Sequence, residues 1–178
     1  TVAPVLSDNP WLRTIVVVGG DAPAGTVSYD DFITGHEAAE TADVSPDDVA
    51  FWLYSSGSTG QPKGVRHVHR SLAATADTYG TNVFGVQEDD VVYSAAKIFF
   101  AYGLGNAMTF PMSVGATTLL FAGRPTPDGV IDILASERPT LFCGVPTLFS
   151  AMLALLEGGA KADFALRLCV SAGEALPE

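Results

Sequence analysis

Short apolar runs alternate with longer amphipathic stretches along most of the chain, and this order limits the fold more than any other feature. The runs that we expect to be strands cover residues 15–18, 49–54, 65–68, 90–94, 116–121, 140–143 and 166–171. The stretches that we expect to be helices cover residues 29–39, 70–84, 103–112, 127–137 and 146–156. Most of the strands lack polar and apolar alternation, which is typical of parallel strands buried on both faces. The sequence therefore predicts an α/β fold with mostly parallel sheet layers covered by helices.

Two details refine this expectation. Ser28 precedes the first predicted helix and is expected to cap it, with Asp30 and Asp31 in the first turn. The run of residues 49–54 is expected to be a buried strand, because five of its six side chains are large and apolar or aromatic.

The 178 residues are enough for one domain with a sizeable core, yet several features favour a piece of a larger protein. The chain starts without Met and stops just after "SAGEALPE", which is expected to open a new element. Charged residues make up 16% of the chain, below the roughly 25% of average soluble domains. A shortage of charge is expected where other parts of the protein cover the surface.

The net charge excludes some classes of partner. Nine Lys and Arg residues stand against twenty Asp and Glu residues, which gives a net charge of −11, and no basic cluster is present. We therefore expect no nucleic-acid partner. No run of about 20 apolar residues is present, so we expect no membrane partner either. Cys143 and Cys169 lie in apolar runs and are expected to be buried free thiols in a reducing compartment, the cytoplasm.

Residues 54–64, "YSSGSTGQPKG", follow a predicted strand and combine three glycines, four aliphatic hydroxyls and one lysine. Glycines let backbone amides converge on an anion, and hydroxyls and lysine add donors and charge, so the loop is expected to bind phosphate. The alternative is a plain turn between two strands. The loop is not a Walker A element, because Pro62 precedes Lys63 and Gly64 follows it. Pro62 also disfavours a helix here and predicts strand, loop, strand.

At these residues the chain resembles the adenylate-forming acyl-CoA synthetase superfamily of AMP-binding enzymes. The loop is similar to that family's signature phosphate loop, and two further blocks support the likeness: residues 97–117, "KIFFAYGLGNAMTFPMSVGAT", and residues 144–177, which contain "GVPTLFSAML" and "LRLCVSAGEALP". Within the family, "FFAYGLGN" and "SAGEALP" resemble benzoate-CoA ligases and their hydroxybenzoate relatives.

The resemblance implies an activity and a domain. Such ligases join an aromatic carboxylate such as benzoate to the AMP part of ATP, and then transfer the acyl group to coenzyme A, with Mg²⁺ assisting; they serve aromatic acid degradation. Residues 1–178 would be the central portion of the large N-terminal AMP-binding domain. The C-terminal domain with the catalytic lysine would be absent, so no catalytic residue is expected here and this piece alone should be inactive. A homodimeric parent protein is compatible with the resemblance.

The resemblance also implies three groups of site residues. The ATP phosphates would lie against Ser55, Ser56, Gly57, Ser58, Thr59, Gly60 and Lys63. The aryl acid would lie against Ala101, Tyr102, Gly103, Ala172 and Gly173, and adenine against Gly173, Glu174 and Ala175. The competing interpretations are that "IFFAYGL" is simply core, and that Gly173 and Glu174 form a plain strand-to-helix turn.

Three other polar residues, two histidines and one lysine, could bind a metal or form an ion pair. His67 and His69 would share one face of a strand, but no Cys, Asp or Glu lies nearby to complete a metal site, so no metal site is predicted. Lys97 is expected to pair with an acidic residue that the sequence does not identify.

Two other functions stay open from the sequence. One is an adenylating enzyme for a cinnamate, a fatty acid or an amino acid, which would need a pocket extending beyond Tyr102 if the acid were long. The other is a non-catalytic nucleotide-binding module that keeps the loop without its partner groups.

Overall fold

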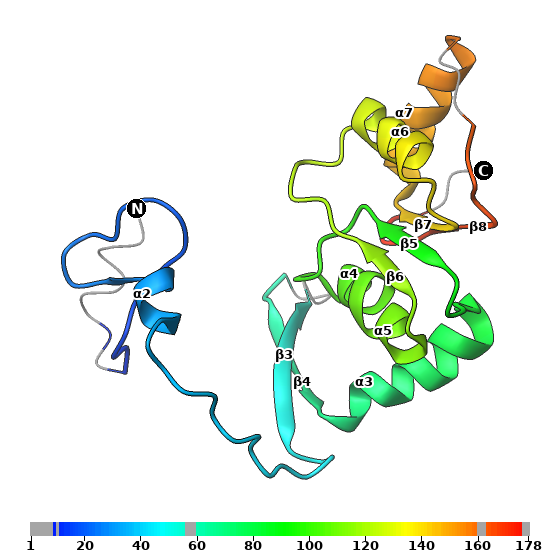
Figure 1. The fold of residues 1–178 in the computed structure, drawn as a ribbon. Helices are drawn as coiled ribbons and strands as arrows, with labels where there is room; N and C mark the ends of the chain where they lie inside the picture. The colour runs from blue at the N-terminus through cyan, green and yellow to red at the C-terminus, as the bar shows by residue number, and fades with distance from the viewer. Residues whose placement is uncertain (1–8, 10, 56–59, 160–162, 176–178) are drawn as a thin grey trace. The chain divides into compact units, whose positions relative to one another are not determined.

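The computed structural model describes residue 9 and residues 11–55, 60–159 and 163–175. The chain forms two compact units, Thr1–Asp43 and Val44–Glu178. Figure 1 shows the elements of both units.

The first unit contains a short parallel strand pair and one helix. Strands β1 (Val16–Val17) and β2 (Val27–Ser28) pair, and helix α2 (Tyr29–Ile33) follows at once. The Ser28 hydroxyl accepts a hydrogen bond from the backbone N–H of Asp31 at 3.1 Å, which confirms the predicted cap. The predicted extension of this helix to residue 39 is wrong. Gly35 adopts a left-handed conformation with φ of 78°, which favours glycine and ends the helix.

The second unit begins with an antiparallel hairpin. Strand β3 (Val49–Ser55) pairs with strand β4 (Lys63–Val68), and Ser55 lies opposite Lys63 where the connecting loop begins and ends. Strand, loop, strand is thus confirmed for the region around Pro62. The expectation that residues 49–54 form a buried strand is wrong, since 59% of Trp52 and 69% of Tyr54 are exposed. The side chains are apolar, as the sequence pattern indicates. They are nevertheless exposed, because a two-stranded hairpin cannot cover both of its own faces.

A four-stranded sheet forms the centre of the second unit. Its strand order is β6 (Thr117–Leu119), β5 (Val91–Ser94), β7 (Leu141–Gly144) and β8 (Leu168–Ser171), and every neighbouring pair is parallel. The predicted parallel sheet is therefore confirmed for these four strands.

Helices connect these strands and cover both faces of the sheet, as predicted (Figure 1). Helix α3 (Arg70–Thr75) continues into the π-helical segment η1 (Ala76–Phe84). A second continuous helical stretch consists of α4 (Ala101–Leu104), the π-helical segment η2 (Gly105–Thr109) and α5 (Phe110–Val114). Helices α6 (Pro127–Ser136) and α7 (Pro146–Glu157) begin with proline, which has no N–H to leave unpaired in the first turn.

Alternate side chains of the central strands enter two separate cores. Tyr93 and Phe142 pack against α6 and α7, whose contribution to this core is Val130, Ile131, Leu134, Leu148 and Met152. The neighbouring residues Val92, Leu141 and Cys143 point to the other face, where Ala76, Phe84 and Phe110 cover them. Each large apolar side chain that is fully buried contributes about 1.5–3 kcal/mol to folding. Because apolar side chains are buried on both faces of the sheet, these strands lack polar and apolar alternation.

The two cysteines differ in burial. Cys143 is a buried free thiol, as predicted, and burial together with the nearby Cys169 raises its pKa to about 12. Cys169 is also a free thiol, but it is exposed, so the prediction of burial is wrong for this residue. It lies on β8, which pairs with β7 on one side and with no other described strand, so one side of β8 stays open.

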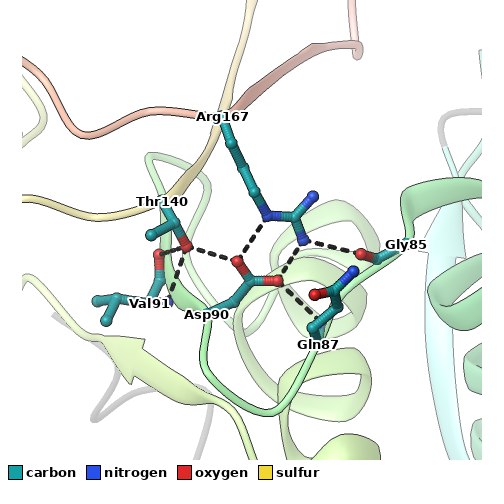
Figure 2. Close-up of polar contacts among 6 residues, drawn as sticks. All are labelled: Gly85, Gln87, Asp90, Val91, Thr140 and Arg167. Carbon is teal, nitrogen blue, oxygen red and sulfur yellow. Dashed lines mark hydrogen bonds and ion pairs between the residues drawn. The ribbon is translucent and has the colours of Figure 1, made fainter.

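A polar cluster, which we call the amino-end clamp, joins three strands of the sheet where they begin. Asp90, Thr140 and Arg167 directly precede β5, β7 and β8 (Figure 2). The Asp90 carboxylate accepts hydrogen bonds from the Thr140 hydroxyl at 2.7 Å and from Arg167 Nε at 2.7 Å. A second guanidinium nitrogen of Arg167 donates to the other carboxylate oxygen and, at 2.8 Å, to the carbonyl of Gly85.

The clamp also binds the backbone around it. The backbone N–H of Gln87 donates to Asp90 at 2.8 Å, and the N–H of Val91 donates to the Thr140 hydroxyl at 3.0 Å (Figure 2). Burial alone would raise the pKa of Asp90. The hydrogen bonds from Arg167, Thr140 and Gln87 outweigh burial and lower this pKa below its ordinary value of 3.8.

Candidate aryl-acid and nucleotide site

A cavity of about 580 Å³ lies at the carboxyl ends of the parallel strands. Its lining includes Lys97, three residues after β5, Val145 and Thr147, just after β7, and Gly173, just after β8. The lining is mostly apolar, and ligand pockets of this kind commonly measure about 300–1,000 Å³. Open α/β sheets bind ligands at the carboxyl ends of their strands, so this cavity is the natural candidate for a small-molecule site.

Tyr102 forms part of the cavity wall from helix α4. Its hydroxyl donates toward the carbonyl oxygens of Gly144 and Val170, at 3.2 Å each, and so connects α4 to the ends of β7 and β8. Burial, with further contributions from Cys143 and Tyr79, raises the pKa of this phenol. Tyr102 therefore stays neutral at physiological pH, with its hydroxyl engaged and its ring available to the cavity.

The remaining residues predicted to contact the aryl acid take different positions. Gly173 lines the cavity with Tyr102, in a left-handed conformation with φ of 88°. Ala101 is exposed, Ala172 is half-buried, and neither lines this cavity. Gly103 is buried beneath the cavity wall, where a Cβ atom would overlap the carbonyl oxygen of Lys97, so this position admits only glycine.

Two of the residues predicted to contact adenine border a second cavity of about 480 Å³. Glu174 and Ala175 line it together with the first turns of helix α7. The Glu174 carboxylate accepts hydrogen bonds from both the backbone N–H and the hydroxyl of Thr147, each at 3.1 Å. A carboxylate at the N-terminus of a helix is stabilised by the unpaired N–H groups and the helix dipole. Glu174 thus has a structural role at this turn, whichever ligand binds.

Only the two ends of the predicted phosphate loop fall within the described residues. Ser55 ends β3, Lys63 begins β4, and both are exposed, as is Gly60. Ser56, Gly57, Ser58 and Thr59 lie outside the described residues. The hairpin register places Ser55 and Lys63 opposite each other, so the loop starts and closes at one end of the hairpin.

Lys97 pairs with no acidic side chain among the described residues, so the predicted acidic partner is not found there. Its ammonium group donates to the carbonyl oxygen of Phe121 and, at 2.6 Å, to that of Gly123. It also lies 5.2 Å from the centre of the Phe121 ring. The partners are backbone groups 24 and 26 residues away, and no feature of the local sequence identifies them.

The histidines also differ from expectation. His67 lies on β4 and stacks on Phe51, with ring centres 5.0 Å apart, whereas His69 follows the strand at the start of α3. The prediction that both share one face of a strand is therefore wrong. Within the described ranges, no group of three or more His, Cys, Asp or Glu side chains is placed to hold a metal ion.

Comparison with known proteins identifies the family. The profile of the AMP-binding enzyme family matches residues 3–178. The chain belongs to the AMP-binding enzyme family. It is 51% identical over 177 residues to the benzoate–CoA ligase of Thauera aromatica, a match that covers 99% of this chain and 33% of that ligase. The chain thus spans about a third of the length of such curated relatives.

Solved structures of AMP-binding enzymes agree with this assignment. A benzoate CoA ligase from Burkholderia xenovorans LB400 matches with a TM-score of 0.77 at 48% identity, covering 92% of this chain and 32% of that one. The anthranilate CoA ligase AuaEII, solved in complex with anthranoyl-AMP, matches with a TM-score of 0.90 at 38% identity, covering 99% of this chain and 34% of that one. The fold is therefore part of the fold of an adenylate-forming enzyme.

Among the described helices, none combines the length and the apolar character needed to cross a lipid bilayer.

Proposed function

We propose that the full-length protein containing this chain is an ATP-dependent aryl-CoA ligase of the benzoate-CoA ligase type. The observation that carries the proposal is the mostly apolar cavity at the carboxyl ends of the strands, lined by Tyr102 and Gly173 in a chain half identical to a benzoate–CoA ligase. A flat aromatic ring suits an apolar cavity with an aromatic wall, since ring faces and edges attract each other.

In this proposal the chain contributes binding and orientation. The loop from Ser55 to Lys63 would hold the β- and γ-phosphates of ATP through Ser55, Ser56, Gly57, Ser58, Thr59, Gly60 and Lys63. Tyr102 and Gly173, together with Ala101, Gly103 and Ala172 around them, would form the aryl site, and Gly173, Glu174 and Ala175 would lie beside adenine. Holding the carboxylate near the α-phosphorus of ATP lowers the barrier by proximity, and positive charge near the phosphates stabilises the charge that develops.

Magnesium has no evident site within the described residues, because no suitable cluster of acidic or imidazole groups is present there. We therefore assign to this chain no step that depends on the metal. Mg²⁺ would accompany ATP and bind groups elsewhere in the full-length protein, as would the lysine expected to promote adenylation. Coenzyme A would act as the acceptor of the acyl group.

The proposal also concerns the compartment and the binding partners of the enzyme. The net charge of −11 argues against nucleic-acid partners, and free thiols at Cys143 and Cys169 suit the reducing cytoplasm. We infer a cytoplasmic enzyme of aromatic acid degradation, without a membrane partner and able to form a homodimer.

The test is a substrate panel with the full-length protein. Purified enzyme is incubated with ATP, Mg²⁺, coenzyme A and a series of acids: benzoate, ring-substituted benzoates, cinnamate, a medium-chain fatty acid and several amino acids. We expect thioester formation and AMP release with benzoate or a substituted benzoate. Turnover confined to cinnamate, the fatty acid or the amino acids would contradict the assignment, and the absence of turnover with every acid would contradict the ligase function itself.

A further inference from the structure

Lys97 occupies an unusual position for a cation. It lines the proposed acid cavity just after β5 and is half-buried there, among mostly apolar neighbours. The three ion pairs formed by described residues all use arginine: Arg70 with Asp47, Arg138 with Asp163 and Arg167 with Asp90. The Lys97 ammonium group instead donates hydrogen bonds to two backbone carbonyl oxygens. A half-buried ammonium group that donates to two backbone carbonyl oxygens links the end of β5 to a distant segment, which indicates that the position of the held segment matters.

The segment that Lys97 holds forms another wall of the same cavity. Phe121 and Gly123 belong to the connection of residues 120–126 between β6 and α6. Pro125 of this connection and Pro127, the first residue of α6, both line the cavity. The Lys97 bonds to Phe121 and Gly123 therefore fix the start of a segment whose end shapes the proposed acid site.

The same residue also contacts the Tyr102 wall through its backbone. The Lys97 carbonyl accepts a hydrogen bond from the N–H of Phe100 at 3.0 Å, just before α4. It also lies directly against Gly103, where any larger residue would collide with it. Lys97 thus touches α4 through its main chain and the 120–126 connection through its side chain. One residue joins two walls of the cavity.

We propose that Lys97 is a positioning residue that fixes the 120–126 connection relative to α4 and thereby sets the shape of the aryl-acid cavity. The inference rests on the proposed function, because it assigns the cavity to the acid. Its specific consequence is that Lys97 governs affinity for the acid and its ring substituents, and not affinity for ATP.

The test compares variants of the full-length enzyme. Lys97→Met keeps a long unbranched side chain but removes the charge and all donors, and Lys97→Arg retains both. For Lys97→Met we expect the backbone N–H of Thr126, which donates to the Arg124 carbonyl at 2.9 Å, to exchange hydrogen at least about tenfold faster, and the KM for benzoate to rise about tenfold, since two charge-assisted hydrogen bonds are lost. The KM for ATP should stay within about twofold, and Lys97→Arg should restore most of the exchange protection and the acid KM.

Two matched variants separate this role from a general effect of charge. Arg124→Met removes one positive charge from the same exposed connection, where no hydrogen bond from its side chain to a described residue is found, and should leave both KM values unchanged. Lys63→Met, in the proposed phosphate loop, should raise the KM for ATP and leave the KM for benzoate within about twofold. If Lys97→Met does not fold, Lys97→Gln is measured in the same way.

Several results would overturn the inference: unchanged exchange of the Thr126 backbone N–H in Lys97→Met, an unchanged KM for benzoate, or KM values for acid and ATP that rise together. Failure of the wild-type enzyme to activate any aromatic acid would remove the proposed function instead. In that case amide exchange, which needs no activity, still decides whether Lys97 holds the connection.

Discussion

Asp90 is a charged group placed almost entirely out of water, with 3% of its side chain exposed. Such a carboxylate is tolerated only if donors replace its hydration, and Arg167, Thr140 and the backbone of Gln87 do so. Arg167 is 40% exposed, so the pair lies at the border between core and solvent. The arrangement contributes to stability because removing any one partner leaves the others with unpaired polar atoms.

The first prediction concerns Asp90→Asn in the full-length protein. Replacing the carboxylate by an amide exchanges one acceptor oxygen for an NH₂ group, which cannot accept a hydrogen bond from Arg167. The substitution should therefore lower the free energy of unfolding by about 2–3 kcal/mol. The difference should depend on pH. The folded pKa of Asp90 lies below its ordinary value of 3.8, so the stabilisation is complete above that value and is lost as the pH falls through the folded pKa.

Urea unfolding of wild type and Asp90→Asn between pH 3 and pH 7 measures this difference. The two proteins should differ most at neutral pH and converge toward the acid end of the series. A difference that stays constant, or that grows as the solution becomes more acidic, would contradict the role given to the ionised carboxylate.

The clamp could not be predicted from the sequence. Thr140 and Arg167 lie 50 and 77 residues from Asp90, and a polar residue before a strand is a common feature of any loop. The Lys97 and Glu174 contacts could not be predicted for the same reason, because their partners lie 26 and 27 residues away in the sequence. Tyr102 and Gly173, by contrast, were expected in the acid site from motif resemblance, and both line the observed cavity.

At the scale of elements, prediction succeeded where a strand or helix has two neighbours to pack against. Strands β5 and β7, with helices α6 and α7, were predicted within one or two residues, because their apolar patterns reflect burial in the two cores. The prediction was wrong about the length of the helix in residues 29–39 and about the burial of residues 49–54, for different reasons. In the first, Gly35 ended a helix that composition favoured; in the second, an apolar run formed an exposed hairpin.

The second prediction concerns helix α7, which receives its N-terminal cap from a residue outside the helix. Glu174→Ala should lower the free energy of unfolding by about 1 kcal/mol, because the Thr147 N–H loses a charged acceptor at the helix N-terminus. Thr147→Val removes only the hydroxyl and should cost less. A double-mutant cycle on the full-length protein measures the coupling between the two side chains, expected at about 0.5 kcal/mol or more. Strictly additive effects would exclude an energetic interaction between Glu174 and the Thr147 hydroxyl.

At the scale of the whole molecule, the described part of the chain contains a sheet whose two edge strands each lack a second neighbour. Within the described sheet, β6 and β8 each pair on one side, and the chain spans about a third of the length of its curated relatives. Open parallel edges invite association with other chains unless something covers them.

The third prediction follows from this incompleteness. Residues 1–178 produced alone should form no acyl-adenylate from benzoate and ATP, because groups outside this chain are expected to promote the chemistry and compensate its charge. They should also self-associate with rising concentration. Pyrophosphate exchange and analytical ultracentrifugation measure the two properties, with the full-length protein as the control in both. Turnover by the 178 residues at a rate near that of the full-length enzyme would contradict the expectation.

The amino-end clamp and the cavity lie at opposite ends of the same strands. Natural variation and laboratory selection can therefore act on the two ends separately. A combinatorial library restricted to the residues just after β5, β7 and β8 could be screened for activity with new acids. The clamp, some four residues away, would keep the register of the strands unchanged in each round of selection.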